Sequence, residues 1–167
     1  IMAEKYAAKA AWAKANPEKA AKLELFFSGK APEVDWAAIE QKAGTATRAA
    51  SATVLGALAM QVENMIVASA DLSNSDKTDG FLKKTHSFKK GDFSGAFFQA
   101  GVSELTMACC CIGMALHGGV IPACGTFFVF SDYMKPAVRM AALMETPVKF
   151  IWTHDAFRVG EDRKSVV

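Results

Sequence analysis

Short apolar runs alternate with longer amphipathic stretches through most of this 167-residue chain. Helical spacing of apolar residues is found at 45–61, 103–117 and 131–143. Strands that alternate with helices predict an α/β fold with a mainly parallel sheet flanked by helices. The runs that fit strands in such a sheet are 64–70, 96–100, part of 120–128, and 148–153.

The first 44 residues have a different character, because they are rich in alanine and lysine. They predict one helix over 3–15 and a second from Pro17 to about Phe27. We expect Asn16 to cap the second helix. This segment carries few side chains suited to chemistry, so we interpret it as a helical linker or packing arm.

Two further local features are expected inside the main domain. Ser131 is placed to cap the helix that runs to Leu143. The segment 76–92 is polar and rich in lysine, and we expect it to form a surface loop.

Composition and charge exclude several classes of protein. A hydrophobic content of 51% is enough for a packed core. The net charge is only +2, and no basic tract is interleaved with aromatic residues, so nucleic-acid binding is not expected. The longest apolar run, 105–130, is interrupted by His117, Gly118, Gly119 and Pro122, which argues against a membrane span. No secretory signal is visible at the start, so a cytoplasmic location is expected.

The cysteines fit the same location. Three of the four, Cys109, Cys110 and Cys111, are consecutive, and Cys124 follows. Consecutive residues of a helix point in different directions, so they do not converge on one metal ion. We interpret them as small apolar residues of a reduced core.

One carboxylate is out of keeping with its surroundings. Glu104 opens an apolar helix just after a strand and a turn at Gly101, and the next acidic or basic side chain other than His117 is Asp132. A carboxylate there either stays at the surface, as a helix-capping residue does, or is buried for a purpose. We expect burial for a purpose.

Several longer motifs place these residues in a known family. They are Gly-Val-Ser-Glu-Leu at 101–105, His-Gly-Gly-Val-Ile-Pro at 117–122, Gly-Thr-Phe-Phe-Val-Phe at 125–130, Asp132-Tyr133, Arg-Met-Ala-Ala-Leu at 139–143, Thr-His-Asp at 153–155 and Gly-Glu-Asp at 160–162. Together they resemble the pyrimidine-binding domain of transketolase, over roughly residues 45–162. The family usually has Arg and His beside the glutamate, where this chain has Ser103 and Leu105.

The resemblance implies a division of the chain into three parts. Residues 1–44 would be the linker that follows a diphosphate-binding domain, and 45–162 would be a pyrimidine-binding domain that is incomplete at its C-terminal end. Residues 163–167 match nothing in the family pattern. The chain is therefore expected to be a fragment that is inactive alone, because the motifs that hold magnesium and the diphosphate do not occur in it.

For the cofactor, the resemblance implies thiamine diphosphate with magnesium bound by the missing domain. Glu104 would bond to the aminopyrimidine ring and promote the tautomer that activates the cofactor. Phe130 would stack on that ring, with Phe127 and Tyr133 completing the pocket and Asp71 lining it. Without the resemblance, the three-residue spacing of these aromatics would be read as ordinary core.

For the substrate, the resemblance implies sugar phosphates that exchange a two-carbon ketol unit. Arg48, Ser75 and His154 would bind the substrate phosphate, and Asp162 would bind a donor hydroxyl group. An arginine fork and a serine hydroxyl are suitable phosphate donors.

Several alternatives and partners remain open. The family builds its site between two subunits, so a homodimer or the missing diphosphate-binding domain is the expected partner. The alternatives are a different thiamine-diphosphate enzyme, a subunit of a split one, and a non-catalytic interaction module.

Overall fold

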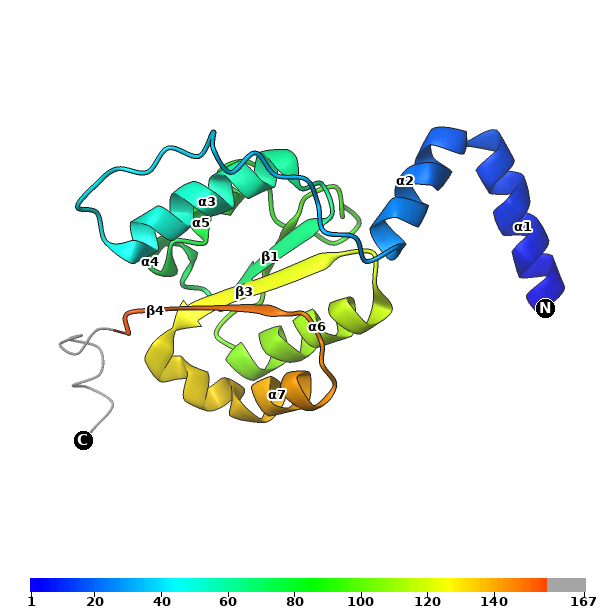
Figure 1. Ribbon diagram of the computed structural model, residues 1–167. Helices are drawn as coiled ribbons and strands as arrows, with labels where there is room; N and C mark the ends of the chain where they lie inside the picture. The colour runs from blue at the N-terminus through cyan, green and yellow to red at the C-terminus, as the bar shows by residue number, and fades with distance from the viewer. Residues whose placement is uncertain (156–167) are drawn as a thin grey trace.

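A four-stranded parallel sheet lies at the centre of the protein, and the computed structural model describes residues 1–155 around it (Figure 1). Its spatial order is β2-β1-β3-β4. The strands are β1 (Met65–Ser69), β2 (Phe97–Gln99), β3 (Ile121–Phe127) and β4 (Lys149–Thr153). The expected α/β fold with a parallel sheet is confirmed.

The register brings the carboxyl ends of all four strands to one edge. Ser69 at the end of β1 pairs with Gln99 of β2 on one side and with Gly125 of β3 on the other. Phe127 at the end of β3 pairs with Thr153 at the end of β4. In open parallel sheets, ligands bind beyond this edge.

Helices cover both faces of the sheet (Figure 1). One face carries α3 (Thr47–Gln61) and α5 (Asp79–Leu82), whose Leu55 and Phe81 pack with Val67, Phe97 and Ala123 of the strands. The short helix α4 (Ser73–Asp76) lies between β1 and α5 in the chain and contacts β3. The other face carries α6 (Glu104–His117) and α7 (Ser131–Leu143), which follows a 3-10 turn, η1 (Phe128–Phe130).

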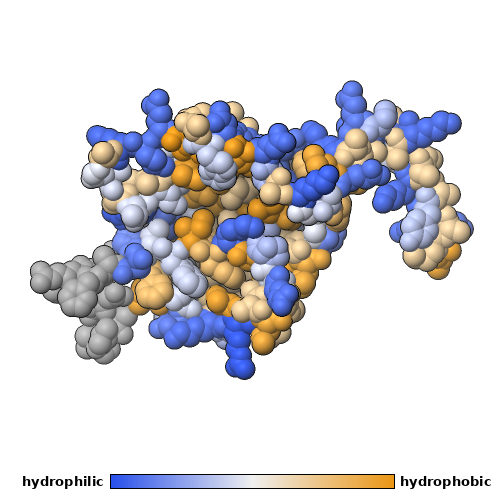
Figure 2. Space-filling model, viewed as in Figure 1, coloured by the Kyte–Doolittle hydropathy of each residue, from blue (hydrophilic) through white to orange (hydrophobic). Residues whose placement is uncertain are grey.

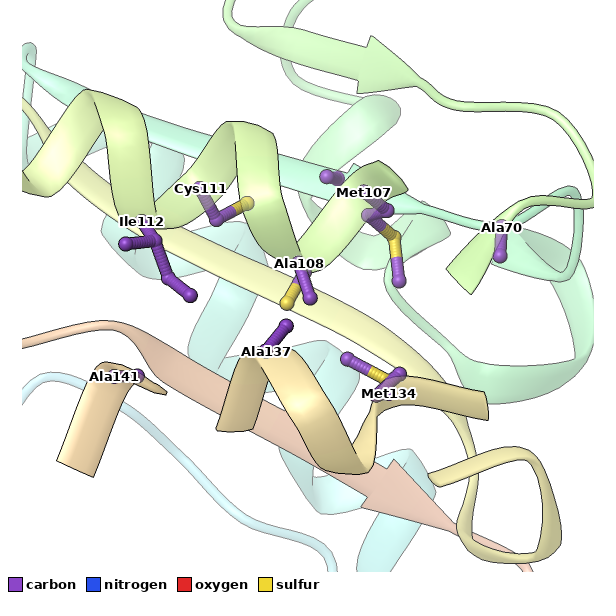
Figure 3. Packing of buried hydrophobic residues seen from close by; sticks show 10 residues of the cluster. Ala70, Met107, Ala108, Cys111, Ile112, Met134, Ala137 and Ala141 are labelled. Carbon is purple, nitrogen blue, oxygen red and sulfur yellow. The ribbon is translucent and has the colours of Figure 1, made fainter. Parts of the chain in front are cut away.

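Small side chains let α6 and α7 pack closely over the sheet. In Figure 3 the side chain of Ala108 on α6 faces α7, with Ala137 of α7 close to it, and Cys111 belongs to the same cluster. Met107 and Met134 are fully buried in the same cluster and fill the space near the start of both helices. This packing fixes the start of α6, and with it the position of Glu104.

An N-terminal arm of two helices, α1 (Met2–Ala15) and α2 (Pro17–Phe27), projects from the domain (Figure 1). Its attachment is Phe27, whose ring lies 5.7 Å from the ring of His117 and packs on Gly118 and Gly119. Lys22 of α2 also forms a salt bridge of 2.7 Å with Glu63. The two predicted arm helices are present, as expected.

Two expected helix caps are corrected by the structure. The side-chain amide of Asn16 donates to the carbonyl of Trp12 at 3.1 Å, so it satisfies the end of α1 and makes no cap bond to α2. Ser131 is the first residue of α7, and no side-chain cap bond is made at that end. The 3-10 turn runs directly into α7, so its backbone leaves no separate capping position there.

The segment 76–92 is only partly the surface loop that its lysines predicted. Asp76, Thr78 and Phe81 are buried, because α5 packs against α3 so closely that a Cβ on Gly80 would lie 2.3 Å from the carbonyl oxygen of Ala52. Farther on, the amide of Phe88 donates to the carbonyl of Phe97 at 2.9 Å. The lysine side chains stay outside while the segment between them enters the core.

Apolar surface lies between polar side chains on the face where β4 runs (Figure 2). Ring contacts on that face link Trp152 of β4 with Phe128 and with Phe150.

Among residues 1–155, no helix combines the length and the apolar character that crossing a membrane requires.

Candidate functional site

An open cavity of about 630 Å³ lies at the carboxyl ends of β1 and β2. Its walls come from the segment after β1, the segment before α6, and the start of α7. The lining residues are Ala70, Asp71, Leu72, Val102, Ser103, Glu104, Leu105, Phe130 and Tyr133. Four of the residues selected from the sequence therefore meet in one cavity: Asp71, Glu104, Phe130 and Tyr133.

Glu104 is the buried acid of this cavity, with 8% of its surface exposed. It is the first residue of α6, where the backbone turns sharply after β2 through Gly101, whose φ is +69°. Within residues 1–155, no side chain or amide donates a hydrogen bond to its carboxylate, whose oxygens open on the cavity instead of being sealed in the core. A ligand in the cavity that donates a hydrogen bond would therefore find a free acceptor there.

Aromatic rings form one wall of the cavity. Phe130 and Tyr133 stack with ring centroids 6.2 Å apart and planes 22° apart. Tyr133 is largely exposed, so its ring is open to contact from outside the chain. Flat aromatic faces beside a buried carboxylate suit a planar heteroaromatic ring that carries a hydrogen-bond donor.

Phe127 lies behind this wall rather than in it. Its ring is buried and stacks on Phe130 at 5.7 Å, with an angle of 11° between the planes. Its other contact is His154, whose ring centroid lies 3.7 Å away. Phe127 therefore connects the cavity to a second group of residues at the end of β4.

This second group joins two residues selected from the sequence. Arg48, in the first turn of α3, places its Nη1 at 2.6 Å from Nε2 of His154, although they are 106 residues apart in the chain. His154 follows β4 directly and has a φ of +56°, an uncommon backbone conformation that recurs at functional sites. Thr153 lies beside it, with Oγ1 at 2.9 Å from Nδ1 of His154.

Of the three remaining predicted residues, two are exposed and one lies outside the described residues. Asp71 is exposed on the cavity rim and has a φ of +64°. Ser75 is exposed on α4, which lies near the first turn of α3 in Figure 1. Asp162 lies outside the described residues.

Asp76 was not selected from the sequence, yet it fixes the loop that carries Asp71 and Ser75. It is fully buried and accepts hydrogen bonds from Ser69 Oγ at 2.8 Å, from the amide of Thr78 at 2.8 Å and from Thr78 Oγ1 at 2.7 Å. Burial raises the pKa of this carboxyl above its ordinary value, against the lowering effect of these donors. Nothing in the local pattern distinguishes Asp76 from its neighbours, because its partners are set by the packing of α4 on the sheet.

The cysteines lie apart from this chemistry. Cys111 and Cys124 are buried, and the neighbouring Cys111 thiol together with burial raises the pKa of Cys124 far above that of a free thiol. Burial of this kind is typical of structural cysteines, whereas Cys109 and Cys110 are exposed and lie outside the expected core. In the described part of the chain, no group of three or more His, Cys, Asp or Glu side chains is arranged to hold a metal ion.

Comparison with known proteins gives this geometry a context. The family described as "Transketolase, pyrimidine binding domain" matches residues 43–165. A transketolase of Bacillus subtilis is 45% identical over an alignment of 150 residues, which covers 87% of this chain and 22% of that protein. The chain thus spans about a fifth of the length of this curated relative.

Solved structures agree with the sequence relatives. A transketolase from Leishmania mexicana superposes with a TM-score of 0.83 at 32% identity, over 92% of this chain and 23% of that one. A transketolase from Pichia stipitis, solved as a complex with sedoheptulose-7-phosphate, superposes with a TM-score of 0.81 at 34% identity, over 92% of this chain and 24% of that one.

Proposed function

Since the chain belongs to the transketolase family, as a pyrimidine-binding domain, we propose that it supplies the pyrimidine half of a thiamine-diphosphate site. The parent activity would be the transfer of a two-carbon ketol unit between sugar phosphates. The observation that carries this proposal is Glu104, a buried carboxylate that accepts no hydrogen bond from residues 1–155 and shares a cavity with two stacked aromatic rings.

The cavity fits an aminopyrimidine ring in shape and chemistry. The stacked rings of Phe130 and Tyr133 offer flat apolar contact, and Glu104 offers an acceptor for a ring N–H. When bound, thiamine diphosphate supplies a nucleophilic carbon centre for the chemistry of the ketol group. In this chain, Glu104 would hold or share the proton at the pyrimidine nitrogen, and the aromatic wall would cover one side of that contact.

The diphosphate and its magnesium ion need a different surface. Among the described residues, the carboxylates on the cavity are those of Asp71 and Glu104, and no Lys or Arg lines it, so the field of these residues disfavours a diphosphate. We therefore assign magnesium and the diphosphate to a diphosphate-binding domain, in a longer chain or in a second copy. Such a homodimer or domain partner would cover the exposed ring of Tyr133.

The second group of residues suits the substrate. Arg48 is a permanent cation, and it lies with His154 beyond the same edge of the sheet, beside Phe127. We assign Arg48, Ser75 and His154 to the substrate phosphate and Asp162 to a donor hydroxyl group. The Pichia stipitis complex with sedoheptulose-7-phosphate supports sugar phosphates as the substrate class.

The test is a chimera, because the proposed site needs residues from another domain. The part of this chain that aligns with the Bacillus subtilis transketolase replaces the matching segment of that protein. Ketol transfer from a ketose phosphate to an aldose phosphate is measured with thiamine diphosphate and magnesium present. We expect an active chimera whose Glu104→Gln variant loses activity by about 10²- to 10⁴-fold, the range for loss of acid–base catalysis.

Glu40→Gln is the matched control, because Glu40 is exposed on the segment before α3 and far in sequence from the cavity. It should leave the activity unchanged, and the isolated 167-residue chain should be inactive. A folded chimera without activity, or an active Glu104→Gln variant, would reject the proposal. Ketol transfer by the isolated chain would reject the assignment of the diphosphate to another domain.

A further inference from the structure

Two contacts of His154 bear on the position of its ring proton. A guanidinium group has only N–H donors and no acceptor, so the 2.6 Å contact between Arg48 Nη1 and His154 Nε2 requires a bare Nε2. A neutral imidazole without a proton on Nε2 carries it on Nδ1. Nδ1–H then donates to Oγ1 of Thr153 at 2.9 Å.

Thr153 is well placed to hold this state. It is the last residue of β4, and 5% of its surface is exposed, so its hydroxyl is kept in place by the sheet rather than by solvent. The ring of Phe127, at 3.7 Å between centroids, limits rotation of the imidazole from the side of β3. His154 itself has an uncommon φ, and its ring lies between Thr153 and Arg48.

We propose that Thr153 is a positioning residue, which fixes His154 in its Nδ1–H tautomer so that Nε2 accepts a hydrogen bond from Arg48 and orients the guanidinium for a phosphate. This inference rests on the proposed function for its ligand, but its geometry does not depend on that function. His154 then serves the phosphate site as a neutral acceptor that aims a cation. Arg48 supplies the charge, and it keeps its other N–H donors for the anion.

The tautomer is measured directly by ¹⁵N NMR of the imidazole rings in the full chain, under mildly alkaline conditions. Only three histidines are present, and His154→Gln assigns the signals of His154. We expect the wild-type ring to carry its proton on Nδ1. Thr153→Val keeps the shape but removes the acceptor, and it should shift the ratio of tautomers toward Nε2–H by about 2- to 12-fold, the value of one hydrogen bond.

Thr153→Ser is the matched control, because it keeps the hydroxyl. It should show the wild-type tautomer of His154. If Thr153 has only a structural role, Thr153→Val would change the amide spectrum of the protein but leave the ring nitrogens of His154 unchanged. A proton on Nε2 in the wild type would overturn the proposal. An unchanged tautomer in a folded Thr153→Val protein would overturn it as well.

The link between Thr153 and phosphate binding is measured in the chimera, in which this chain replaces the matching segment of the Bacillus subtilis transketolase. There Thr153→Val should raise the KM for the phosphorylated substrate by about 2- to 12-fold with a smaller change in kcat, and Thr153→Ser should restore it. An unchanged KM in an active chimera would reject the link to the phosphate. An inactive chimera would reject the proposed function, while the NMR result would still decide the tautomer.

Discussion

Two aspartates of this protein respond to their surroundings in opposite ways. Asp76 is buried between β1 and β3, and burial raises the pKa of its carboxyl. Asp92 is exposed, and hydrogen bonds from Ser94 lower the pKa of its carboxyl. The residue type is the same, so the difference comes entirely from solvation and partners.

The raised pKa of Asp76 predicts an unusual dependence of stability on pH. Between its ordinary pKa and the raised one, the folded state binds more protons than the unfolded state, so the contribution of Asp76 to the free energy of unfolding is full at low pH and falls as the pH rises. Asp76→Asn removes this dependence while Oδ1 can still accept from Thr78. We expect the variant to gain stability relative to wild type as the pH rises from about 4, in urea unfolding at several pH values.

Asp92→Asn is the contrasting control for this experiment. The lowered pKa of Asp92 means that its contribution is present above the ordinary pKa and is lost as the pH falls through the folded value. That variant should therefore lose stability relative to wild type as the pH rises. The same trend in both variants would contradict the assignment for Asp76.

Helix α5 packs closely on α3. The two helices approach so closely that Gly80 and Gly56 lie at the contact, with the carbonyl oxygen of Gly80 3.2 Å from a Cβ built on Gly56. This approach draws Phe81 of α5 into the core, where it packs with residues of the strands. It is the reason that this segment is not simply a surface loop.

Gly80→Ala should therefore be destabilising. The added Cβ would meet the backbone of Ala52, which cannot move without separating α5 from α3, and overpacking of this kind costs about 1–3 kcal/mol. Gly113→Ala on α6 is the control, since nothing lies within 4 Å of its Cβ, and alanine in a helix should stabilise by about 0.5–1 kcal/mol. Chemical unfolding measures both, and a neutral Gly80→Ala would contradict the close approach.

At the scale of the whole molecule, the protein is a domain with an attached arm. The arm contacts the domain through Phe27, which covers the turn between α6 and β3 at His117, Gly118 and Gly119. This turn lies at the opposite end of α6 from Glu104. The arm therefore attaches away from the cavity and leaves it open.

Phe27→Ala should loosen the arm without unfolding the domain. The ring is half exposed, so its removal loses about 1 kcal/mol, less than full burial of a phenylalanine provides. Amide hydrogen exchange in α2 should become about fivefold faster, while the amides of β1 and β3 stay unchanged. Tyr6→Ala, which removes an exposed ring from α1, should have no such effect. Faster exchange throughout the sheet would show that Phe27 belongs to the core.

Local patterns in the chain were enough to predict the parallel α/β fold, the positions of the main helices and strands, and Glu104 at the start of α6. Each of these depends on periodicity or on a turn, which neighbouring residues determine. The motif around Glu104 also indicated the family. The residues at 102–105 are consecutive and all line the cavity, so this part of the site is visible as one short sequence motif.

Contacts between distant segments could be decided only by tertiary packing. Arg48 meets His154 because α3 packs on the face of the sheet beside the end of β4. Phe127 lies behind Phe130 because η1 follows β3 directly and its turn brings the ring of Phe130 back onto that of Phe127. Burial of Asp76 likewise depends on α4 and the sheet, and no local pattern of hydrophobic and polar residues contains that information.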